Sequence, residues 1–225
     1  MKVTAIIVAG GSGTRMGMDK NKAFIPLLGD AIIKHTVNAF CSVKEISKLI
    51  IVTRKVDIPE CQEIFSDLKV DFEIIEGGKT RQESVYQGLS RVDGGISLIH
   101  DAARALIEKS DIEAVISGVR AHGAATVGVL AVDTLKRVDK DGFIVETIDR
   151  DGVYRIQTPQ GFMTDDIKKA HTMAIKDGFE ATDDCGLYEK YIGRVRVIEG
   201  KGSNIKITYP EDLGFAEEIL KRNRG

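Results

Sequence analysis

The sequence has few of the residues that mark several common classes of protein. Tryptophan is absent, and only three cysteines occur in 225 residues. Cys41, Cys61 and Cys185 are widely spaced and form no C-x-x-C motif, which argues against a disulfide framework or a zinc site and favours a reducing cytoplasm. The formal net charge of −2 provides no global positive field, so nucleic acid is not an expected partner.

Long hydrophobic runs are also missing. The apolar stretches are far shorter than the roughly 18 residues that a membrane-spanning helix requires. Met1 and Lys2 lead straight into a strand-like segment with no small-residue cleavage site behind it, so a signal peptide is not expected. We therefore expect a cytoplasmic protein that neither spans a membrane nor binds nucleic acid.

Short apolar runs, in contrast, recur along the chain. Several are continuous rather than alternating, which is typical of strands covered by helices on both faces. The predicted strands are Val3–Val8, Leu49–Thr53, Phe72–Ile75, Ile96–Ile99, Ala125–Leu130 and Arg194–Ile198. Helical patterns lie between them, so we predict a single α/β domain over residues 1–225 with a mostly parallel sheet.

Local signals indicate where some helices begin. Thr80-x-x-Glu83 and Ser110-x-x-Glu113 each match a capping box, in which a hydroxyl and a carboxylate cap the first turn. Pro210, followed by two acidic residues, suits the start of a last helix that runs to about Lys221.

One region, residues 134–155, departs from this alternation. It reads "TLKRVDKDGFIVETIDRDGVYR", two alternating segments joined at Asp139–Gly142, which is a hairpin signal with an Asp-Gly turn. The segment has too few large apolar residues to form core. We predict a protruding β-hairpin arm, and such an arm invites a partner subunit to cover it.

The stretch Val8–Phe24, "VAGGSGTRMGMDKNKAF", suggests an anion site after the first strand. It is not a Walker A loop, because no Gly-Lys-Ser/Thr closes it, and Met16 stands where a dinucleotide fingerprint needs its third glycine. Its glycines allow close approach of the backbone, while Arg15 and Lys22 can neutralise phosphate. The alternative is an ordinary tight turn with two solvated surface cations.

Four blocks, "AGGSGTRMGMDKNK", "EGGKTRQESVYQGL", "HDAAR" and "NIKITYPEDL", with "VDTLK", "YRIQTPQGF" and "ATDD" between them, extend over essentially the whole chain. In this order they resemble the 2-C-methyl-D-erythritol 4-phosphate cytidylyltransferases. The resemblance implies a Rossmann-like nucleotidyltransferase fold with a projecting arm, and a homodimer. It also implies that CTP and a sugar-alcohol phosphate react with Mg²⁺ present, giving a cytidine diphosphate adduct and pyrophosphate. Two positions depart from the family pattern, Gly10 in place of alanine and Ala105 in place of proline.

The resemblance assigns the nucleotide half of the site. It implies that three cations hold and neutralise the reacting phosphates, that one carboxylate binds the metal, and that glycines and small residues line the cytidine. The implied catalytic residues are Arg15, Lys22 and Lys206, the metal ligand is Asp101, and the nucleotide contacts are Gly10, Gly11, Gly78, Ser84 and Ala102.

The resemblance also assigns the second substrate. Arg150 and Thr158 match residues that bind methylerythritol phosphate, and in the family they reach across the dimer interface. Arg104 orders its loop or carries charge near the substrate. Asp183 and Asp184 either cap a helix or border the substrate, and the sequence leaves both readings open.

The sequence contains no convincing Ser-His-Asp, Cys-His or paired-carboxylate constellation, which fits a reaction that needs no general base. The rival readings are a ribitol-5-phosphate cytidylyltransferase, a transferase of another nucleotide such as UMP or GMP, and a non-catalytic nucleotide-binding module. The segment "GKTRQESV" is more similar to the methylerythritol enzymes. The presence of Arg15, Lys22, Asp101 and Lys206 together argues against a module that only binds.

Overall fold

The computed structural model describes residues 1–11 and 21–224. A seven-stranded sheet has the order β11-β7-β10-β6-β1-β4-β5. Every neighbouring pair in it is parallel except the two that involve β10, which is antiparallel to β6 and to β7. The mostly parallel α/β sheet predicted from the apolar runs is therefore confirmed. Its strands are β1 (Val3–Ala9), β4 (Ile46–Thr53), β5 (Phe72–Glu76), β6 (Ile96–Asp101), β7 (Ala124–Leu130), β10 (Tyr154–Met163) and β11 (Arg196–Glu199).

Helices cover both faces of the sheet, which explains why β1 is apolar at consecutive positions. Ala5 and Ile7 of β1 pack in a cluster with α1 (Ile32–Cys41), α2 (Ile58–Ile64) and α4 (Lys109–His122). Ile6, between them, points to the opposite cluster, which contains α3 (Arg81–Leu89), α5 (Thr164–Asp177) and α6 (Asp184–Tyr191). Alternate side chains of one strand thus enter two different cores, as expected for a doubly covered sheet.

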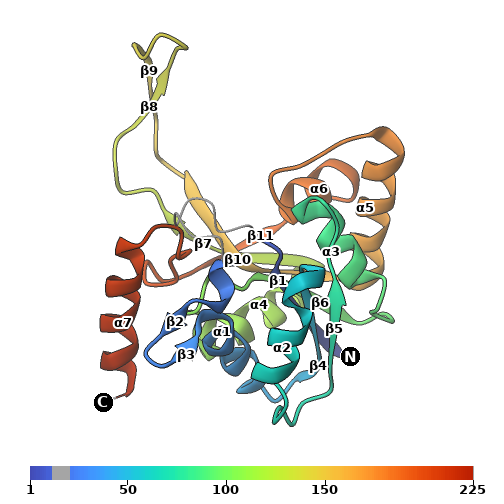
Figure 1. Cartoon of the computed structure of the whole chain (residues 1–225). Helices are drawn as coiled ribbons and strands as arrows, with labels where there is room; N and C mark the ends of the chain where they lie inside the picture. The colour runs from blue at the N-terminus through green and yellow to red at the C-terminus, as the bar shows by residue number, and fades with distance from the viewer. Residues whose placement is uncertain (12–20, 225) are drawn as a thin grey trace.

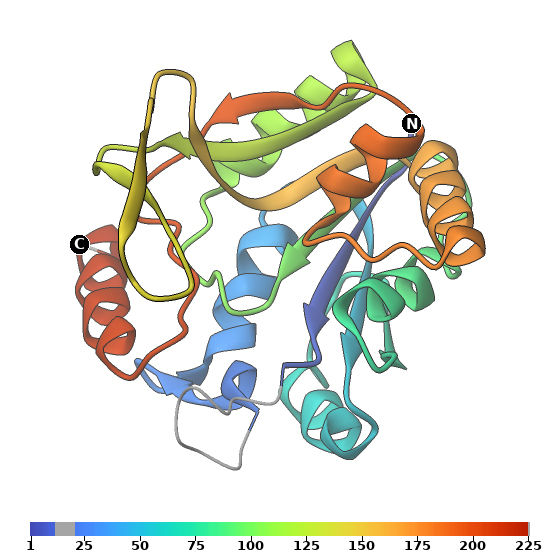
Figure 2. The ribbon, with the colours of Figure 1, turned by 90° about the horizontal axis from the view of Figure 1, so that it is seen from above.

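A third, smaller apolar cluster holds the last helix. It joins α7 (Glu211–Arg224), through Ala216, to Leu27 of β2 (Pro26–Leu27), to Ile32 and to Ile207. β2 pairs with β3 (Asp30–Ala31) in a separate two-stranded sheet. In Figures 1 and 2, α7 lies at the opposite side of the molecule from α5. No helix in the part of the chain that the structure describes is long and apolar enough to cross a membrane.

One of the two predicted capping boxes forms in part, because the Glu83 carboxylate accepts the Lys79 N–H, at 2.6 Å, in place of the Thr80 N–H. The Thr80 hydroxyl accepts a hydrogen bond from the Glu83 N–H at 3.1 Å and caps α3. The Ser110 prediction is wrong: α4 begins at Lys109 with Glu108 as its N-cap residue. The N–H groups of residues 111 and 112 both bind the Glu108 carbonyl, so Ser110 already lies inside the first turn.

The predicted arm is present as β8 (Leu135–Val138) and β9 (Ile144–Ile148), an antiparallel hairpin that projects away from the sheet in Figure 1. In its turn the Asp139 carboxylate accepts the N–H groups of Asp141 and Phe143, and Gly142 has φ +89°, a conformation that glycine adopts without strain. Phe143 and Ile144 at the tip are 71% and 64% exposed. An arm that contributes no core leaves these apolar side chains without cover in the single chain.

Candidate active site

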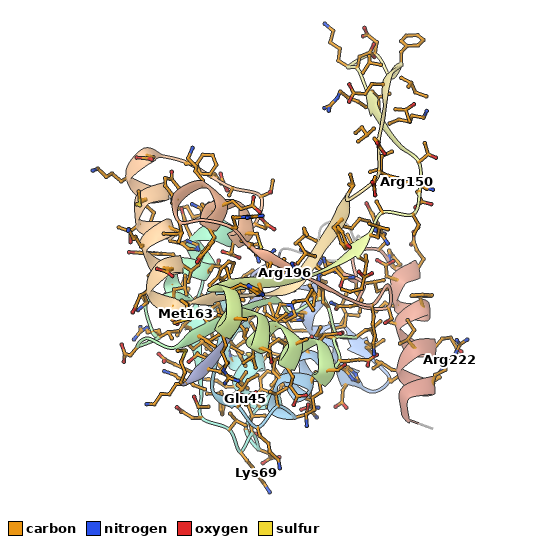
Figure 3. All side chains as sticks on the ribbon, turned by 180° about the vertical axis from the view of Figure 1, so that it is seen from behind. Glu45, Lys69, Arg150, Met163, Arg196 and Arg222 are labelled. Carbon is orange, nitrogen blue, oxygen red and sulfur yellow. The ribbon has the colours of Figure 1, made fainter. Side chains whose placement is uncertain are left out.

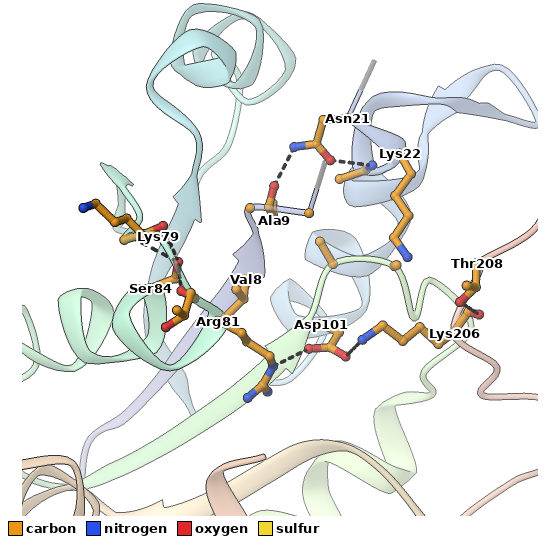
Figure 4. A pocket seen from close by; sticks show the side chains of 17 residues that line it. Val8, Ala9, Asn21, Lys22, Lys79, Arg81, Ser84, Asp101, Lys206 and Thr208 are labelled. Atoms are coloured by element: carbon orange, nitrogen blue, oxygen red, sulfur yellow. Dashed lines mark hydrogen bonds and ion pairs between the residues drawn. The ribbon is translucent and has the colours of Figure 1, made fainter. Parts of the chain in front are cut away.

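A cavity of about 430 Å³ opens beyond the carboxyl ends of β1 and β6, where ligands bind in open parallel sheets. In Figure 4 the side chains of Lys22, Arg81, Asp101 and Lys206 reach this cavity from four separate segments of the chain. The described residues that line it are Val8, Ala9, Gly10, Gly11, Asn21, Lys22, Ala23, Gly78, Lys79, Thr80, Arg81, Ser84, Asp101, Ala102, Ala103, Lys206 and Thr208. Arg15, a predicted catalytic residue, lies outside the described residues.

Lys22 is held at the mouth of this cavity by its neighbour Asn21. The buried Asn21 amide donates to the Ala9 carbonyl at 2.6 Å and to the Asp57 carboxylate at 2.8 Å. Its oxygen accepts from the Ala23 N–H and caps the short 3-10 helix Lys22–Phe24. The end of β1 and the start of the lysine segment are therefore tied together. The Lys22 ammonium also donates to the Ile207 carbonyl at 3.0 Å, which brings it beside Lys206.

Asp101, the last residue of β6, is shared between two cations. Its Oδ2 lies 2.7 Å from the Lys206 ammonium and its Oδ1 lies 3.1 Å from Nε of Arg81. Burial opposes ionisation, but the charges of Arg81 and Lys206 outweigh it and hold the pKa of the Asp101 carboxyl well below its usual range. Asp101 is therefore an ionised carboxylate throughout the physiological pH range.

Arg81 is a cavity residue that the sequence analysis missed. It is the first residue of α3, where the partial positive charge of a helix N-terminus disfavours a cation. Its guanidinium is compensated by Asp101 and by Asp184, the latter at 2.7 Å from Nη1. Burial lowers the pKa of Arg81, but these two carboxylates outweigh that effect and raise it. An arginine at an unfavourable helix position was the available signal that distant acidic partners exist.

The loop before α3 supplies the opposite wall. A Cβ on Gly78 would lie 2.3 Å from Cβ of Glu83, so only glycine fits there. The Ser84 hydroxyl donates to the Thr80 carbonyl at 2.9 Å and accepts from the Gly78 N–H at 3.1 Å, which fixes the loop against the helix. Gly10, in contrast, has room for a methyl group, since its nearest neighbour would be Oγ of Ser84 at 3.8 Å. Contacts among the described residues would therefore also allow alanine, the usual family residue, at position 10.

Three predicted site residues lie away from the cavity wall. The buried Thr158 hydroxyl accepts from the Asp101 N–H at 3.1 Å and pairs with Nδ1 of His100 at 3.0 Å. Arg104 donates to the Asn204 carbonyl at 2.8 Å and so ties its loop to the segment that carries Lys206. Arg150 lies at the base of the arm (Figure 3). Its guanidinium donates to the Val132 carbonyl.

The buried His100 gives a pH-dependent contribution to stability. Burial lowers the pKa of His100 to about 3, from 6.5. Between these values the unfolded chain binds the extra proton, so stability falls as the pH falls from about 6.5, by up to about 1.4 kcal/mol per pH unit. We expect urea unfolding at pH 6.5, 5.5 and 4.5 to show this loss, and the His100→Gln variant to show a flatter dependence. Parallel slopes for the two proteins would contradict the assignment.

The donor set of the cavity suits a hard cation that brings most of its own ligands. Asp101 is the one carboxylate among the described cavity residues, and no cluster of three or more His, Cys, Asp or Glu occurs in the described ranges. Mg²⁺ is usually held by one or two carboxylates together with water and substrate phosphates. The residues present therefore fit Mg²⁺ bound with a phosphorylated substrate and not an all-protein cage.

Lys22, Arg81 and Lys206 come from three segments and line the cavity that holds Asp101, at the carboxyl edge of a mostly parallel sheet. No cysteine or histidine lines the described part of the cavity. Such a site can neutralise and orient phosphates, as the reaction of a nucleotidyltransferase requires. The family model for 2-C-methyl-D-erythritol 4-phosphate cytidylyltransferase matches residues 3–222. The chain belongs to this family.

Individual relatives agree with the family assignment. A 2-C-methyl-D-erythritol 4-phosphate cytidylyltransferase of Clostridium novyi is 44% identical, over 98% of this chain and 97% of its own length. Among solved structures, a 4-diphosphocytidyl-2C-methyl-D-erythritol synthase of Anaerococcus prevotii superposes with a TM-score of 0.87 at 33% identity, covering 98% of this chain and 96% of its own. The cytidylyltransferase of Thermus thermophilus superposes with a TM-score of 0.83 at 28% identity, covering 98% of this chain and all of its own.

Proposed function

We propose that this chain transfers the cytidylyl group of CTP to 2-C-methyl-D-erythritol 4-phosphate, giving 4-diphosphocytidyl-2-C-methyl-D-erythritol and pyrophosphate in isoprenoid precursor synthesis. The observation that carries the proposal is the cavity lined by Lys22, Arg81 and Lys206, the last two of which are paired with Asp101. Family membership supplies the identity of the two substrates.

The reaction requires little proton transfer. A phosphate monoester has its second pKa near about 6 and is largely a dianion at neutral pH. One of its oxygens forms the new bond to the α-phosphorus of CTP, the bond from that phosphorus to the bridging oxygen breaks, and pyrophosphate leaves with the electron pair. Catalysis then consists of holding two polyanions in line and stabilising charge on the α-phosphate.

In the proposed mechanism Lys22 and Lys206 perform this neutralisation together with Arg15. Lys22 and Lys206 come from opposite ends of the chain and are joined through the Ile207 carbonyl, so their ammonium groups enter the same side of the cavity. We place the triphosphate there, against the backbone of Gly10 and Gly11. Asp101 would hold Mg²⁺ in this site. When bound, the ion would supply further positive charge to neutralise the triphosphate oxygens.

We place the cytosine and ribose on the other wall. Gly78 borders the cavity with its backbone alone, because a Cβ there would clash with Glu83, and its N–H is held by the Ser84 hydroxyl. The Ser84 hydroxyl uses its one hydrogen on a neighbouring carbonyl but keeps acceptor capacity. Ala102, at the carboxyl end of β6, offers a small side chain beside the ribose. Backbone groups can read the cytosine N4 amine and O2, which suits a wall built in this way.

The methylerythritol phosphate site is proposed to be completed by a second copy of the chain. Arg150 lies on the arm base and Thr158 lies in β10 below it, and neither lines the described cavity of a single chain. Exposed apolar side chains at the arm tip, including Phe143 and Ile144, support a subunit that covers them. In a homodimer the arm of one protomer delivers Arg150 to its partner. Arg104 has an ordering role, since it fixes the Asn204 segment.

We infer a cytoplasmic location. Cys41, Cys61 and Cys185 are all free thiols, and burial raises the pKa of each of them, to about 12 for Cys61. Three unpaired and weakly reactive cysteines suit a reducing compartment.

The test is pyrophosphate release with CTP and Mg²⁺, with methylerythritol 4-phosphate and ribitol 5-phosphate compared in parallel. We expect turnover with the first substrate and little with the second, and loss of turnover when Mg²⁺ is chelated. A preference for ribitol 5-phosphate would overturn the substrate and retain the chemistry. CTP binding without pyrophosphate release from any sugar phosphate would identify a module that only binds.

A further inference from the structure

The Arg81 guanidinium lies between two carboxylates that differ in their access to the cavity. Asp101 lines the cavity, and its Oδ1 is 3.1 Å from Nε of Arg81. Asp184, the first residue of α6, lies outside the cavity lining, and its Oδ2 is 2.7 Å from Nη1 of the same guanidinium. The Asp184 side chain is only 1% exposed, whereas that of Arg81 is 28% exposed. One counterion therefore faces the substrate space and the other is buried behind the arginine.

Asp184 is itself held by a buried histidine. Nε2 of His171, in α5, lies 3.1 Å from Oδ1 of Asp184, and the His171 side chain is fully buried. Because an ionised carboxylate can only accept, Nε2 of His171 carries the hydrogen of this bond. Burial raises the pKa of Asp184, but Arg81 and His171 outweigh it, so the pKa is lowered and the group is a carboxylate.

The backbone at the start of α6 is fixed as well. Oε1 of Gln160, in the interior strand β10, accepts the N–H groups of Asp184 and Cys185 at 3.0 and 3.2 Å. Nε2 of Gln160 donates to Asp183, whose other oxygen accepts the Gly186 N–H and caps α6. The two acidic neighbours thus differ in role: Asp183 caps the helix, and Asp184 points to Arg81. Together these bonds leave the Asp184 carboxylate little freedom to move.

The start of α3 is anchored to the same region. Gln82, next to Arg81, donates to the Phe179 carbonyl and accepts from the Ala181 N–H, both at 3.1 Å. The start of α3, which carries Arg81, is therefore bonded to the segment between α5 and α6, which leads to Asp184. The two ion pairs use two of the five N–H donors of Arg81, and none of the other described residues binds the remaining ones.

The two counterions of Arg81 are unequal once substrate is bound. Asp101 is also paired with Lys206, and it is the carboxylate that fits the metal. A carboxylate that turns to a metal weakens its hold on the arginine, and the N-terminus of α3 disfavours a cation in any case. Asp184 cannot be drawn away in the same manner, because it is buried and clamped. It keeps the guanidinium in place when Asp101 is engaged elsewhere.

We propose that Arg81 contacts the triphosphate with its remaining N–H donors and that Asp184 and His171 are its positioning residues. The inference rests on the proposed function of this site. In this proposal Asp184, the second aspartate of "ATDD", lies outside the cavity and acts on the substrate only by orienting Arg81.

A double-mutant cycle in the full-length protein tests this dependence. We expect Asp184→Asn and Arg81→Gln each to lower kcat/KM for CTP by roughly 10–100-fold, the range for residues that orient a functional group. If Asp184 acts through Arg81, the double variant is no worse than Arg81→Gln alone. A merely structural role would multiply the two losses, and that multiplicative result would overturn the proposal.

Matched variants separate positioning from folding. Asp177→Asn replaces an exposed carboxylate that accepts the Tyr191 hydroxyl between α5 and α6, away from Arg81 and Asp184, and we expect its kcat/KM to stay within about twofold of wild type. At position 171, glutamine can place an N–H donor near the position of Nε2, whereas leucine cannot. His171→Gln should therefore keep most of the activity that His171→Leu loses, at equal thermal stability. Equal losses in the glutamine and leucine variants would contradict the role of His171.

The wild-type assay distinguishes a failure of this inference from a failure of the proposed function. Absence of pyrophosphate release by the wild-type protein would refute the function only. In that case calorimetry measures the Kd of CTP for Asp184→Asn, Arg81→Gln and the double variant. A double variant that binds CTP no more weakly than Arg81→Gln alone supports the positioning role of Asp184. Independent, additive losses of binding free energy overturn it.

Discussion

Replacing Lys22 with alanine is expected to lower kcat by roughly 10²–10³-fold, the loss typical when one preorganised group that stabilises transition-state charge is removed. The reason is geometric: Asn21 fixes the start of the lysine segment to the end of β1, so the ammonium is in place before the reaction begins. Steady-state kinetics with both substrates measure the change. A raised KM for CTP at unchanged kcat would mean that Lys22 only binds the ground state.

A control is needed because Lys22 also bonds the Ile207 carbonyl, and its loss could release the segment that carries Lys206. Lys34→Ala removes a nearby lysine that pairs with Asp30 at 2.8 Å on the surface of α1. We expect Lys34→Ala to retain wild-type kcat, since exposed ion pairs contribute little. Thermal unfolding of both variants shows whether the effect of Lys22→Ala exceeds any change in stability.

Replacing Arg150 with alanine is expected to lower kcat/KM for methylerythritol phosphate by roughly 10–150-fold, the equivalent of one lost charge-assisted hydrogen-bond contact. The affinity for CTP should hardly change, because Arg150 lies on the arm and outside the described cavity. Kinetics with each substrate varied in turn, together with calorimetry of CTP, measure the division. Equal weakening for the two substrates would remove Arg150 from the sugar-phosphate site.

Complementation tests whether the arm acts on the partner. In a heterodimer of a Lys22→Ala chain with an Arg150→Ala chain, a site shared between protomers places both lesions in one active site and leaves the other intact. Such heterodimers should regain roughly half of the wild-type activity, since one of two symmetric sites is complete. If Arg150 serves its own chain, each site carries one lesion and no activity returns. Size-exclusion chromatography with light scattering establishes whether the dimer forms.

Most of the sheet was predictable because its strands are apolar on both faces. β1, β4 and β6 extend the runs predicted from sequence by only a few residues. The exception is β10, the antiparallel strand between β7 and β6, which was not predicted. It contains Gln157, Thr158 and Gln160, which are all buried. These polar groups are satisfied by partners such as Asn204, His100 and α6, and a pattern based on hydrophobicity does not register such partners.

Some residues of the cavity could likewise be predicted from the sequence, and others could not, because their partners are distant in the chain. Lys22 and Asp101 stand out in the sequence as charged residues next to apolar runs, Lys206 stands out through the family resemblance of its motif, and the structure brings the three to one cavity. Arg81 and Asn21 did not stand out. Arg81 is paired with residues 20 and 103 positions away, and Asn21 binds a carboxylate 36 positions away. The residues next to them in the sequence do not identify these partners.

The sequence by itself determined the alternation of strands and helices, the hairpin arm and the family, because these depend on residues close together in the chain or on ordered motifs. Only the tertiary structure decided that Asp101 is ionised between Arg81 and Lys206, that Asp184 lies behind the arginine, and that Thr158 is buried beneath the cavity. Charge state and hydrogen bonding in a folded protein depend on which distant groups share a low-dielectric space. That arrangement is established when the sheet brings the ends of its strands to one edge.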